Sequence, residues 1–596
     1  MADYVPPLRD IRFTLEHIVD LPSLSKLDTF KHADPETVYG LLDEFGRFVA
    51  EVLAPIDRTG DREGIRLDTA TGAVTTASGW ADAYAKYVDA GWGSVPFPDE
   101  HGGGGFPWLL AIAMQELMTS ANMSWSMCPL LTQGAIEMLM HHGSEEQQEV
   151  YLRPMVSGEW TGTMNLTESQ AGSDVGALTT KAVPSDDGSW RITGQKIFIT
   201  YGEHDMADNI VHLVLARVPD APPGTKGISC FIVPKLLVND DGTLGERNAV
   251  RCIGVEHKMG IHASPTCTLE YDGAVGYLIG GEPNHGMRQM FTMMNNARLS
   301  VGLEGLAIAE TAYQQALQYA RERVQGRPIG GAAGETGSIV DHLDVRRMLL
   351  TMRSLIEAMR GLIYLNAQAL DLARHADTDD ARSANQELAD LLTPMSKGWC
   401  TDMGTEVASL ALQVHGGMGY IEETGIAQRY RDIRIAAIYE GTNGIQGMDL
   451  VGRKLPMRAG GAIDDLLTRI EELDAELAAA GDPLASIRSA LADAVSALRT
   501  STTWLLDNGG ADPAHALAGA TPYLRQWGIV VGGWVLARQA LAALPGDDDD
   551  DYCAAKLATA RFYCDQLLPQ ASGLVAAVTA GKDELLSLTP EQLESR

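Results

Sequence analysis

The sequence predicts an α+β protein of several domains, in which helical regions flank a β domain and a further helical region follows. Two observations lead to this fold class. The chain has 596 residues, more than the roughly 250 to 300 at which a single hydrophobic core stops growing. The spacing of its apolar residues also changes from a helical period to short β-branched runs and back again.

Five segments follow from these changes of pattern. Residues 1–34 form an N-terminal extension, and residues 35–160 a helical domain with apolar spacing as in "FPWLLAIAMQELM". The β domain covers residues 161–285, where runs such as "DNIVHLVLARV" alternate with Pro/Gly/Asp turns. Long helical patterns return over residues 286–458. Residues 459–596, rich in Ala and Leu, form an extra C-terminal helical domain.

The charge balance excludes several classes of partner. The chain carries 46 basic and 79 acidic side chains, with a formal charge of −33. This charge repels nucleic acid and an anionic membrane surface, so we expect neither as a partner. The apolar stretch "QWGIVVGGWVLA" is shorter than the about 20 residues that cross a bilayer, so it predicts a buried helix and no membrane insertion. The acidic run at residues 547–551 predicts a solvated loop.

The cysteines and the N-terminus bear on the cellular compartment. Seven cysteines are scattered without a CxxC pair, which predicts neither a metal site nor a disulfide framework. We expect reduced thiols. The N-terminal "MADYVPPLRDIRF" lacks the basic-then-apolar pattern of a signal peptide and the Arg/Ser-rich composition of a transit peptide. The protein is therefore expected to remain in the cytoplasm.

Two motifs in the β domain suit a ligand. "NLTESQAGSDV" contains the turn Gly172-Ser173, at which the backbone can approach a phosphate or a polar heterocycle. An ordinary β-turn explains the same residues. "GQKIFITYG" places Phe198 beside the hydroxyl of Thr200, and this stretch is equally typical of a core strand.

Two more motifs lie in the second helical domain. "QVHGGMGY" is rich in glycine but has no βαβ unit around it, which argues against a dinucleotide-binding Rossmann fold. "YEGTNGIQ" places the carboxylate of Glu440 between an apolar run and a Gly-Thr-Asn-Gly turn, and Thr442 or Asn443 can cap the helix that follows. Glu440 is either a functional acid or a second, less usual capping acid.

Taken together and in this order, the motifs resemble those of the acyl-CoA dehydrogenase family over about residues 35–455. "LTESQAGSD" is similar to the family's TEPxAGSD, "KIFITYG" to its KxWITN/G and "YEGTNGIQ" to its YEGTxxIQ. The N-terminal "PPLRDIRFTLEHIV" and the extra C-terminal domain resemble a longer subgroup that includes methylthiopropionyl-CoA dehydrogenases and broad-range mycobacterial acyl-CoA dehydrogenases. The resemblance implies a helical bundle, a β-barrel-like sandwich, a second helical bundle and the additional C-terminal helical domain.

The resemblance implies an FAD-dependent oxidoreductase of fatty acid β-oxidation. Such an enzyme converts an acyl-CoA into a trans-2-enoyl-CoA and passes electrons to an electron-transferring flavoprotein. Glu440 matches the catalytic base, and the apolar flank "IAAIY" is expected to raise its pKa toward working pH. In some relatives the base instead precedes a CoA-contacting arginine. That arginine resembles Arg298 here, and the preceding residue is Ala297, which favours Glu440.

The resemblance also assigns binding residues by position. An aromatic ring at position 198 can stack on the flavin. The residues expected to bind FAD are Leu166, Thr167, Gly172, Ser173, Phe198, Ile199, Thr200, Arg323, Gln413, Gly416, Gly417, Thr442 and Asn443. The residues expected to contact the acyl-CoA are Ser173, Asn295, Arg298 and Gly441.

Arg323 resembles an arginine that pairs with the FAD pyrophosphate of a neighbouring subunit, which implies a homo-oligomer. We expect a dimer in place of the family's common tetramer, because the extra C-terminal domain can replace a subunit contact. Three departures from the family pattern stand out. The stretch "RVQG" after Arg323 lacks the usual phenylalanine, Asn295 replaces an acid that contacts CoA, and Gly444 replaces a glutamine.

The identity of the acyl group is open at this point. Met123, Trp125 and Met294 are candidates to line the acyl slot. The Met-rich "MRQMFTMMNN" suits a thioether or a variable chain, and it equally suits ordinary helix packing. The alternatives are a methylthiopropionyl-CoA dehydrogenase, an acyl-CoA oxidase, and a non-catalytic protein that binds acyl-CoA or flavin.

Overall fold

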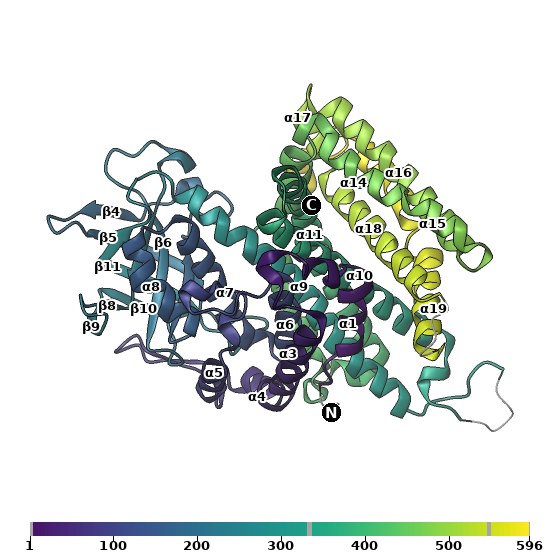
Figure 1. Ribbon diagram of the computed structural model, residues 1–596, viewed down its shortest axis with the longest axis horizontal. Helices are drawn as coiled ribbons and strands as arrows, with labels where there is room; N and C mark the ends of the chain where they lie inside the picture. The colour runs from purple at the N-terminus through teal and green to yellow at the C-terminus, as the bar shows by residue number, and fades with distance from the viewer. Residues whose placement is uncertain (1–3, 331–335, 545–549, 595–596) are drawn as a thin grey trace. The chain divides into compact units, whose positions relative to one another are not determined.

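The computed structural model describes residues 4–330, 336–544 and 550–594 (Figure 1). Contacts divide the chain into two compact units. Unit 1 consists of Met1–Asp43 and Arg298–Arg596, and unit 2 of Glu44–Ala297. The helices α3 (Pro35–Phe48) and α9 (Gly286–Glu322) continue across the boundary along the chain. The five predicted segments are a finer division that stays a prediction, and part of the acidic run, residues 547–549, lies outside the described residues.

The helices of unit 2 begin and end at well-defined caps. Helix α8 starts at a capping box, in which Ser144 accepts from the backbone N–H of Gln147 and the Gln147 side chain accepts from that of Ser144. Asn122 separates two buried helices and caps the second one by accepting from the N–H of Trp125. The helices are α4 (Ala54–Glu63), α5 (Trp80–Asp89), α6 (Trp108–Ala121), α7 (Met123–His142) and α8 (Glu145–Ser157).

A mixed sheet forms the rest of unit 2. Its strands are β3 (Trp160–Asn165), β4 (Lys181–Pro184), β5 (Trp190–Thr200), β6 (Asn209–Ala216), β7 (Ser229–Pro234), β10 (Val250–Val255) and β11 (Thr266–Leu278). The order is β3-β6-β7-β11-β5-β4, with β10 paired to β11. The β3–β6 pair is parallel and the other pairs in this sheet are antiparallel. Two separate two-stranded sheets are formed by β1 (Arg66–Leu67) with β2 (Val74–Thr75) and by β8 (Leu236–Val238) with β9 (Leu244–Arg247).

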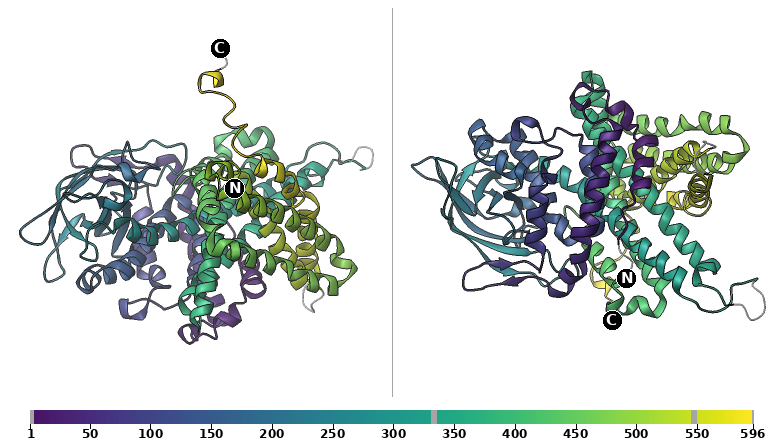
Figure 2. Two further views of the ribbon diagram at one scale, coloured as in Figure 1. Left: turned by 90° about the horizontal axis from the view of Figure 1, so that it is seen from above. Right: turned by 60° about the horizontal axis from the view of Figure 1, so that its bottom comes forward.

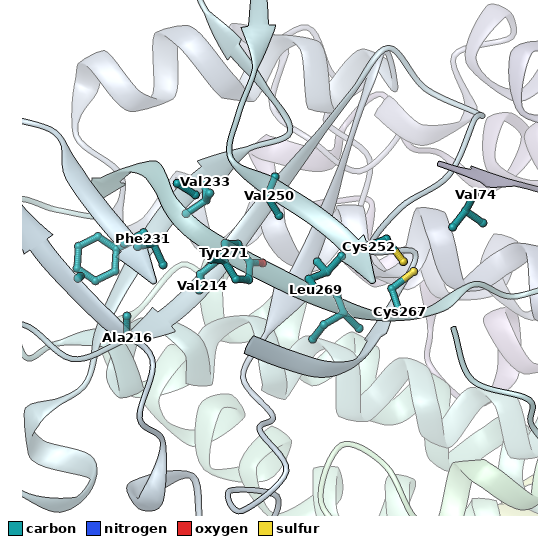
Figure 3. Close-up of a cluster of buried hydrophobic side chains, with 14 residues drawn as sticks. Val74, Val214, Ala216, Phe231, Val233, Val250, Cys252, Cys267, Leu269 and Tyr271 are labelled. Atoms are coloured by element: carbon teal, nitrogen blue, oxygen red, sulfur yellow. The ribbon is translucent and has the colours of Figure 1, made fainter. Parts of the chain in front are cut away.

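Strand β11 joins the two halves of this sheet. It pairs with β5 and β10 over most of its length and with β7 at Tyr277 and Leu278. One buried apolar cluster takes side chains from both halves (Figure 3), including Ile199 from β5, Leu269 from β11 and Phe231 from β7. The β-branched runs of the sequence therefore form one packed β domain, as their pattern predicts.

Unit 1 is helical. Its helices after α9 are α10 (Leu343–His375), α11 (Asp379–His415), α12 (Ile426–Ile433), α13 (Asn443–Asp449), α14 (Gly461–Glu471), α15 (Leu473–Ala480), α16 (Ala485–Gly509), α17 (Pro513–Leu517), α18 (Ala520–Ala542), α19 (Asp550–Gln566), α20 (Gln570–Gly573) and α21 (Val575–Thr579). After α21 the chain leads away from the helices of this unit (Figure 2), and residues 583–594 are exposed.

The prediction of a buried helix at "QWGIVVGGWVLA" is confirmed. This stretch lies within α18, where residues 526–537 are all buried. Gly528 lets α18 approach α11 closely, because a Cβ there would lie 2.1 Å from the ring of Trp399. Among the described residues no helix is both long enough and apolar enough to span a membrane.

The N-terminal extension is an integral part of unit 1. Helix α1 (Leu8–His17) places Asp10 2.7 Å from the buried Nζ of Lys556 on α19. Tyr552 also donates to Asp10, and its ring lies edge-on to Phe13. These contacts join segments at opposite ends of the chain, so the extension and the extra C-terminal domain stabilise each other.

Candidate active site

Glu440 lies in a tight turn between two short helical segments. The 3-10 turn Arg434–Ala437 precedes it and α13 follows. Glu440 has a φ of +56° and Gly441 a φ of +83°, so both adopt the left-handed conformation. For a non-glycine residue this costs roughly 1–2 kcal/mol and persists only where the surroundings hold it. Such strain is typical of functional positions.

Two side chains hold this turn. Thr442 caps α13 by accepting from the N–H of Ile445, as one of the two predicted caps. Gln446, fully buried, donates from Nε2 toward the carbonyl oxygens of Glu440 at 3.3 Å and Gly441 at 3.4 Å. The turn therefore presents the Glu440 side chain from a fixed backbone.

The side chain of Asn443 connects the turn to α11. Its amide donates to the Gly398 carbonyl at 3.0 Å and to Asp402 at 2.7 Å, both on α11, while its Oδ1 accepts from Lys397. These contacts anchor the turn to α11. Any FAD contact at position 443 is thus left to the backbone, because local packing engages the side-chain amide.

The surroundings of Glu440 raise the pKa of its carboxyl. Burial raises its pKa to about 7, although the charges of Arg298 and Lys397 act in the opposite direction. A carboxyl with this pKa can take up a proton at neutral pH and hold it.

Arg298 comes from α9 and lies beside the Gly441 backbone. A Cβ at Gly441 would be 3.8 Å from Nη2 of Arg298 and 3.0 Å from Nε2 of Gln446. Arg298 is buried, its Nη1 is 3.7 Å from Asp449, and its Nε has no hydrogen-bond partner among the residues that the structure describes. A buried guanidinium with an unused donor suits an acyl-CoA carbonyl or phosphate.

Three further residues interact with Glu440 or lie next to it, and they were not identified from the sequence. Lys397 on α11 and Glu304 on α9 are fully buried, and Tyr439 donates to Glu304. Burial raises the pKa of Glu304 to about 8, with the Tyr439 hydrogen bond and Lys397 acting against it. The sequence does contain a signal for Lys397 and Glu304. Each is the single charged residue in an otherwise uncharged stretch, "TPMSKGW" and "VGLEGLAIA" respectively.

In unit 2, Phe198 projects from a β-bulge. Residues 197 and 198 of β5 together oppose one residue of β11, because the pairing shifts between Lys196–Leu269 and Ile199–Cys267. Phe198 has a φ of +60° and is 58% exposed. A rigidly held, exposed aromatic ring is suited to a planar ligand.

The two neighbours of Phe198 differ in orientation. Thr200 is half-buried. Ile199 is 2% exposed and its side chain belongs to the apolar core of the sheet. The expected flavin contact of Ile199 can therefore involve only its backbone, because the strand alternation turns its side chain inward.

The loop that carries Leu166 to Ser173 is fixed by a buried ion pair. Lys196 on β5 donates to Glu168 at 2.8 Å and to the Leu166 carbonyl at 2.9 Å. The carbonyl of Thr167 accepts from the N–H of Ile197. Gly172 and Ser173 are exposed at the end of this loop, and a Cβ on Gly172 would meet nothing within 4 Å. The loop thus presents accessible backbone.

The remaining predicted residues are mostly exposed. Arg323 follows the end of α9 and donates to Gln325. Gln413, Gly416 and Gly417 lie at the exposed end of α11, where Gly416 has a φ of +59°. Asn295 is exposed on α9, one turn before Arg298.

The three residues that were candidates to line the acyl slot differ in exposure. Met123 and Trp125 are 0% exposed within the helices of unit 2, and the indole of Trp125 donates to the carbonyl of Trp80. The expectation that these two line an acyl slot stays a prediction, and the structure shows only that any such slot at this place is enclosed. Met294 is half-buried.

Comparison with known proteins identifies the family. The models of the acyl-CoA dehydrogenase N-terminal, middle and C-terminal domains match residues 36–159, 163–274 and 284–455, and an "acetyl-CoA dehydrogenase C-terminal like" model matches residues 467–589. A 3-methylmercaptopropionyl-CoA dehydrogenase of Ruegeria pomeroyi is 47% identical over 587 residues, which cover 98% of this chain and 99% of that protein. The chain belongs to the acyl-CoA dehydrogenase family.

Two other comparisons define this acyl-CoA dehydrogenase further. The broad-specificity linear acyl-CoA dehydrogenase FadE5 of Mycobacterium tuberculosis is 34% identical over 593 residues, 96% of each chain. A crystal structure of an acyl-CoA dehydrogenase from Bacillus anthracis, complexed with FAD, superposes with a TM-score of 0.74 at 20% identity and covers 93% of this chain and 89% of that one. The predicted fold class, the resemblance to the longer subgroup and the assignment to oxidoreductases acting on a CH–CH bond are confirmed.

The acyl-CoA dehydrogenase family is FAD-dependent, and the residues present suit this cofactor. Phe198 offers an exposed ring, Thr200 a hydroxyl, and the anchored loop at Gly172 and Ser173 accessible N–H groups. A flavin ring and a pyrophosphate require these three kinds of contact.

Proposed function

We propose that the protein oxidises a short acyl-CoA to its trans-2-enoyl-CoA, with Glu440 as the base. The observation that carries this proposal is the position of Glu440 in a strained, anchored turn with a pKa of about 7. In the reaction the α C–H bond breaks and its proton goes to the Glu440 carboxylate. FAD, when bound, supplies the acceptor for the β-hydrogen as a hydride, so that two electrons leave the substrate and a double bond remains.

The chain's own residues prepare the α-carbon for this step. The backbone N–H of Glu440 is proposed to donate to the thioester oxygen, where negative charge develops as the α-proton leaves. Gly441 lets the thioester approach the backbone, because a side chain there would take up this space and crowd Gln446, whose Nε2 would lie only 3.0 Å from its Cβ. Arg298 supplies a buried positive charge close to the same turn. Together these groups favour the charge distribution of the transition state.

The favoured substrate is 3-methylmercaptopropionyl-CoA. The support is the 47% identity, over nearly the full length of both chains, with an enzyme named for that substrate. Other linear acyl-CoAs are the second candidate, because the relative named for broad specificity is also similar along almost its entire length. An electron-transferring flavoprotein is proposed as the acceptor, and a role in fatty acid β-oxidation and a location in the cytoplasm remain predictions.

The residue assignments are proposed as follows. In unit 2, FAD contacts Leu166, Thr167, Gly172, Ser173, Phe198, Thr200 and the backbone of Ile199. In unit 1, FAD contacts Arg323, Gln413, Gly416, Gly417, Thr442 and the backbone of Asn443. The acyl-CoA contacts Ser173, Asn295, Arg298 and Gly441. Arg323 is proposed to reach the FAD of a second subunit in a homodimer, and light scattering of the wild-type protein and of Arg323→Ala, together with their FAD content, tests this.

An anaerobic titration of the FAD-bound protein tests the proposed function. The flavin absorbance is followed while 3-methylmercaptopropionyl-CoA, butyryl-CoA, octanoyl-CoA or palmitoyl-CoA is added. Fast bleaching by 3-methylmercaptopropionyl-CoA, with slower bleaching by the longer chains, is the expected result. Absence of bleaching by every acyl-CoA would overturn the proposal. Assays of hydrogen peroxide with and without an electron-transferring flavoprotein distinguish a dehydrogenase from an oxidase.

A further inference from the structure

Lys397 is a buried lysine that the mechanism above does not use. It lies within α11, its side chain is 0% exposed, and its neighbours Ser396 and Gly398 are buried as well. An ammonium group in such a place is strongly unfavourable unless nearby groups compensate for its lost hydration. Its surroundings therefore indicate what it is for.

The hydrogen bond of Lys397 leads to the turn that carries the base. Its Nζ donates to Oδ1 of Asn443 at 2.9 Å. The amide nitrogen of Asn443 in turn donates to the Gly398 carbonyl and to Asp402. Asn443 lies only three residues after Glu440, so Lys397 helps to fix the turn against α11.

The charge of Lys397 also acts on Glu440. Burial lowers the pKa of Lys397 to about 8, and the largest opposing effects come from Glu440 and then from Glu304. With this pKa the side chain is mostly an ammonium at neutral pH. Glu304, whose pKa burial raises to about 8, is mostly neutral at the same pH. Glu440 is therefore the carboxylate on which the ammonium charge mainly acts.

Charged and titratable groups from several elements interact around Glu440. They are Arg298 and Glu304 from α9, Lys397 and Asp402 from α11, Arg434 from the 3-10 turn, Tyr439 and Glu440 from the following turn, Asp449 from α13, Arg453 from the segment after α13, and Arg525 from α18. Asp449 is 3.7 Å from Arg298, and Asp402 accepts from Asn443. Lys397 is thus a cation that acts on Glu440, and its own hydrogen bond is to the uncharged amide of Asn443.

We propose that Lys397 is a positioning residue for the base: its ammonium group keeps Glu440 ionised before substrate arrives, and its hydrogen bond to Asn443 holds the turn that carries Glu440. The proposal rests on Glu440 being the base. It assigns to Lys397 a role without substrate contact, which separates it from the groups that take part in the reaction. Two functions of one side chain, charge and hydrogen bonding, can then be separated by substitution.

The test compares Lys397→Met, which removes both functions, with Lys397→Gln, which removes the charge and keeps an N–H donor. The measured quantity is the second-order rate constant of flavin bleaching by the best acyl-CoA, at subsaturating substrate, between pH 5.5 and 9.5. In the wild-type protein this rate constant rises as Glu440 ionises. Removal of a nearby cation raises the pKa of a carboxyl by about one unit or more, so both variants should shift the acid limb upward by about one unit. At pH 6 this shift corresponds to a roughly tenfold loss.

Two further variants serve as controls. Lys397→Arg keeps the charge, and its acid limb should stay near that of the wild-type protein even if its rate is lower. Lys556→Met removes another buried lysine of unit 1, one that pairs with Asp10 and Glu357. This control should leave the acid limb in place, because Lys556 does not act on Glu440.

Each result of this pH series leads to a different conclusion about Lys397. An acid limb that does not move in Lys397→Met and Lys397→Gln, when the rate falls at all pH values, overturns the electrostatic role and leaves a structural one. If the neutral variants retain too little FAD, Lys397→Arg decides alone. A shifted acid limb contradicts the proposal, and a wild-type acid limb together with wild-type FAD content supports it, because only the cation is then restored. Absence of bleaching in the wild-type protein is a failure of the proposed function and not of this inference.

Discussion

Each unit of the protein contains a buried lysine that acts on a glutamate, and the two arrangements have opposite consequences. In unit 2, Lys196 contacts Glu168 at 2.8 Å. In unit 1, Lys397 donates its hydrogen bond to Asn443. The charge of Lys397, and not this hydrogen bond, acts on Glu440. Burial lowers the pKa of both lysines to about 8. The pKa values of the two glutamates differ much more than those of the two lysines.

The pKa values of the two glutamates differ because their carboxylates accept different numbers of hydrogen bonds. Burial raises the pKa of Glu168, but the charge and hydrogen bond of Lys196 and the hydrogen bonds of Thr180 and Thr179 more than offset it, and the pKa falls to about 2. For Glu440 burial is the dominant effect and the pKa rises to about 7. A buried carboxylate that accepts many hydrogen bonds stays ionised and acts as a structural anchor, whereas one that accepts few has a raised pKa, which suits a base.

The largest expected effect is on catalysis at Glu440. Glu440→Gln keeps the shape of the side chain and removes the proton acceptor, so the rate of flavin bleaching should fall by at least about 10²-fold. FAD content should remain that of the wild-type protein. Glu168→Gln serves as the comparison, since the chemistry per FAD-bound molecule should survive there. A Glu440→Gln variant that bleaches at the wild-type rate would show that another residue is the base.

Next comes the stability of unit 2. Glu168→Gln leaves Lys196 buried without its counter-charge, so the free energy of unfolding should fall by about 3 kcal/mol. Urea unfolding followed by tryptophan fluorescence measures this change. Glu270→Gln, an exposed substitution on the neighbouring strand β11, should change it by less than about 0.5 kcal/mol. Equal effects of the two substitutions would contradict a special role for the pair.

A smaller effect distinguishes the two glutamates by the sign of their pH dependence. The folded-state pKa of Glu168 lies below the unfolded value of 4.5, so its stabilisation is present above pH 4.5 and is lost as the pH falls toward 2. The folded-state pKa of Glu440 lies above 4.5, so ionising it disfavours folding increasingly from pH 4.5 to 7. Glu440→Gln should therefore increase the free energy of unfolding by about 1 kcal/mol at pH 8 and by almost nothing at pH 4. A variant less stable than wild type at pH 8 would refute this reasoning.

The smallest expected effect concerns the cap that follows the base. Thr442→Ala removes the acceptor for the N–H of Ile445 and should lower the free energy of unfolding by about 1 kcal/mol. Thr442→Ser keeps the hydroxyl and is the matched control. FAD affinity measured on both variants shows whether the hydroxyl also contacts the cofactor, as proposed. An alanine variant as stable as the serine variant would exclude the capping role.

Much of the fold could be predicted from local pattern. The apolar spacing located the β domain and the buried α18, and the Thr442 cap followed from residue type next to a helix start. What packs around a residue could not be predicted in this way. Met123 and Trp125 are apolar in any context, and only the structure shows that both are fully buried. Asn443 suits a ligand by residue type, and only the structure shows that its amide donates to α11.

The sequence by itself determined the family and located the proposed FAD-binding motifs and the proposed base, because each rests on residues adjacent in the chain. The tertiary structure alone decided the pKa of Glu440. Tyr439 meets Glu304 across 135 residues of sequence, and Lys397 meets Asn443 across 46. The tertiary structure also decided that α1 packs against α19, which joins residues 10 and 552. Burial and the distance between charges set a pKa, and both are properties of folded segments that are remote in the chain.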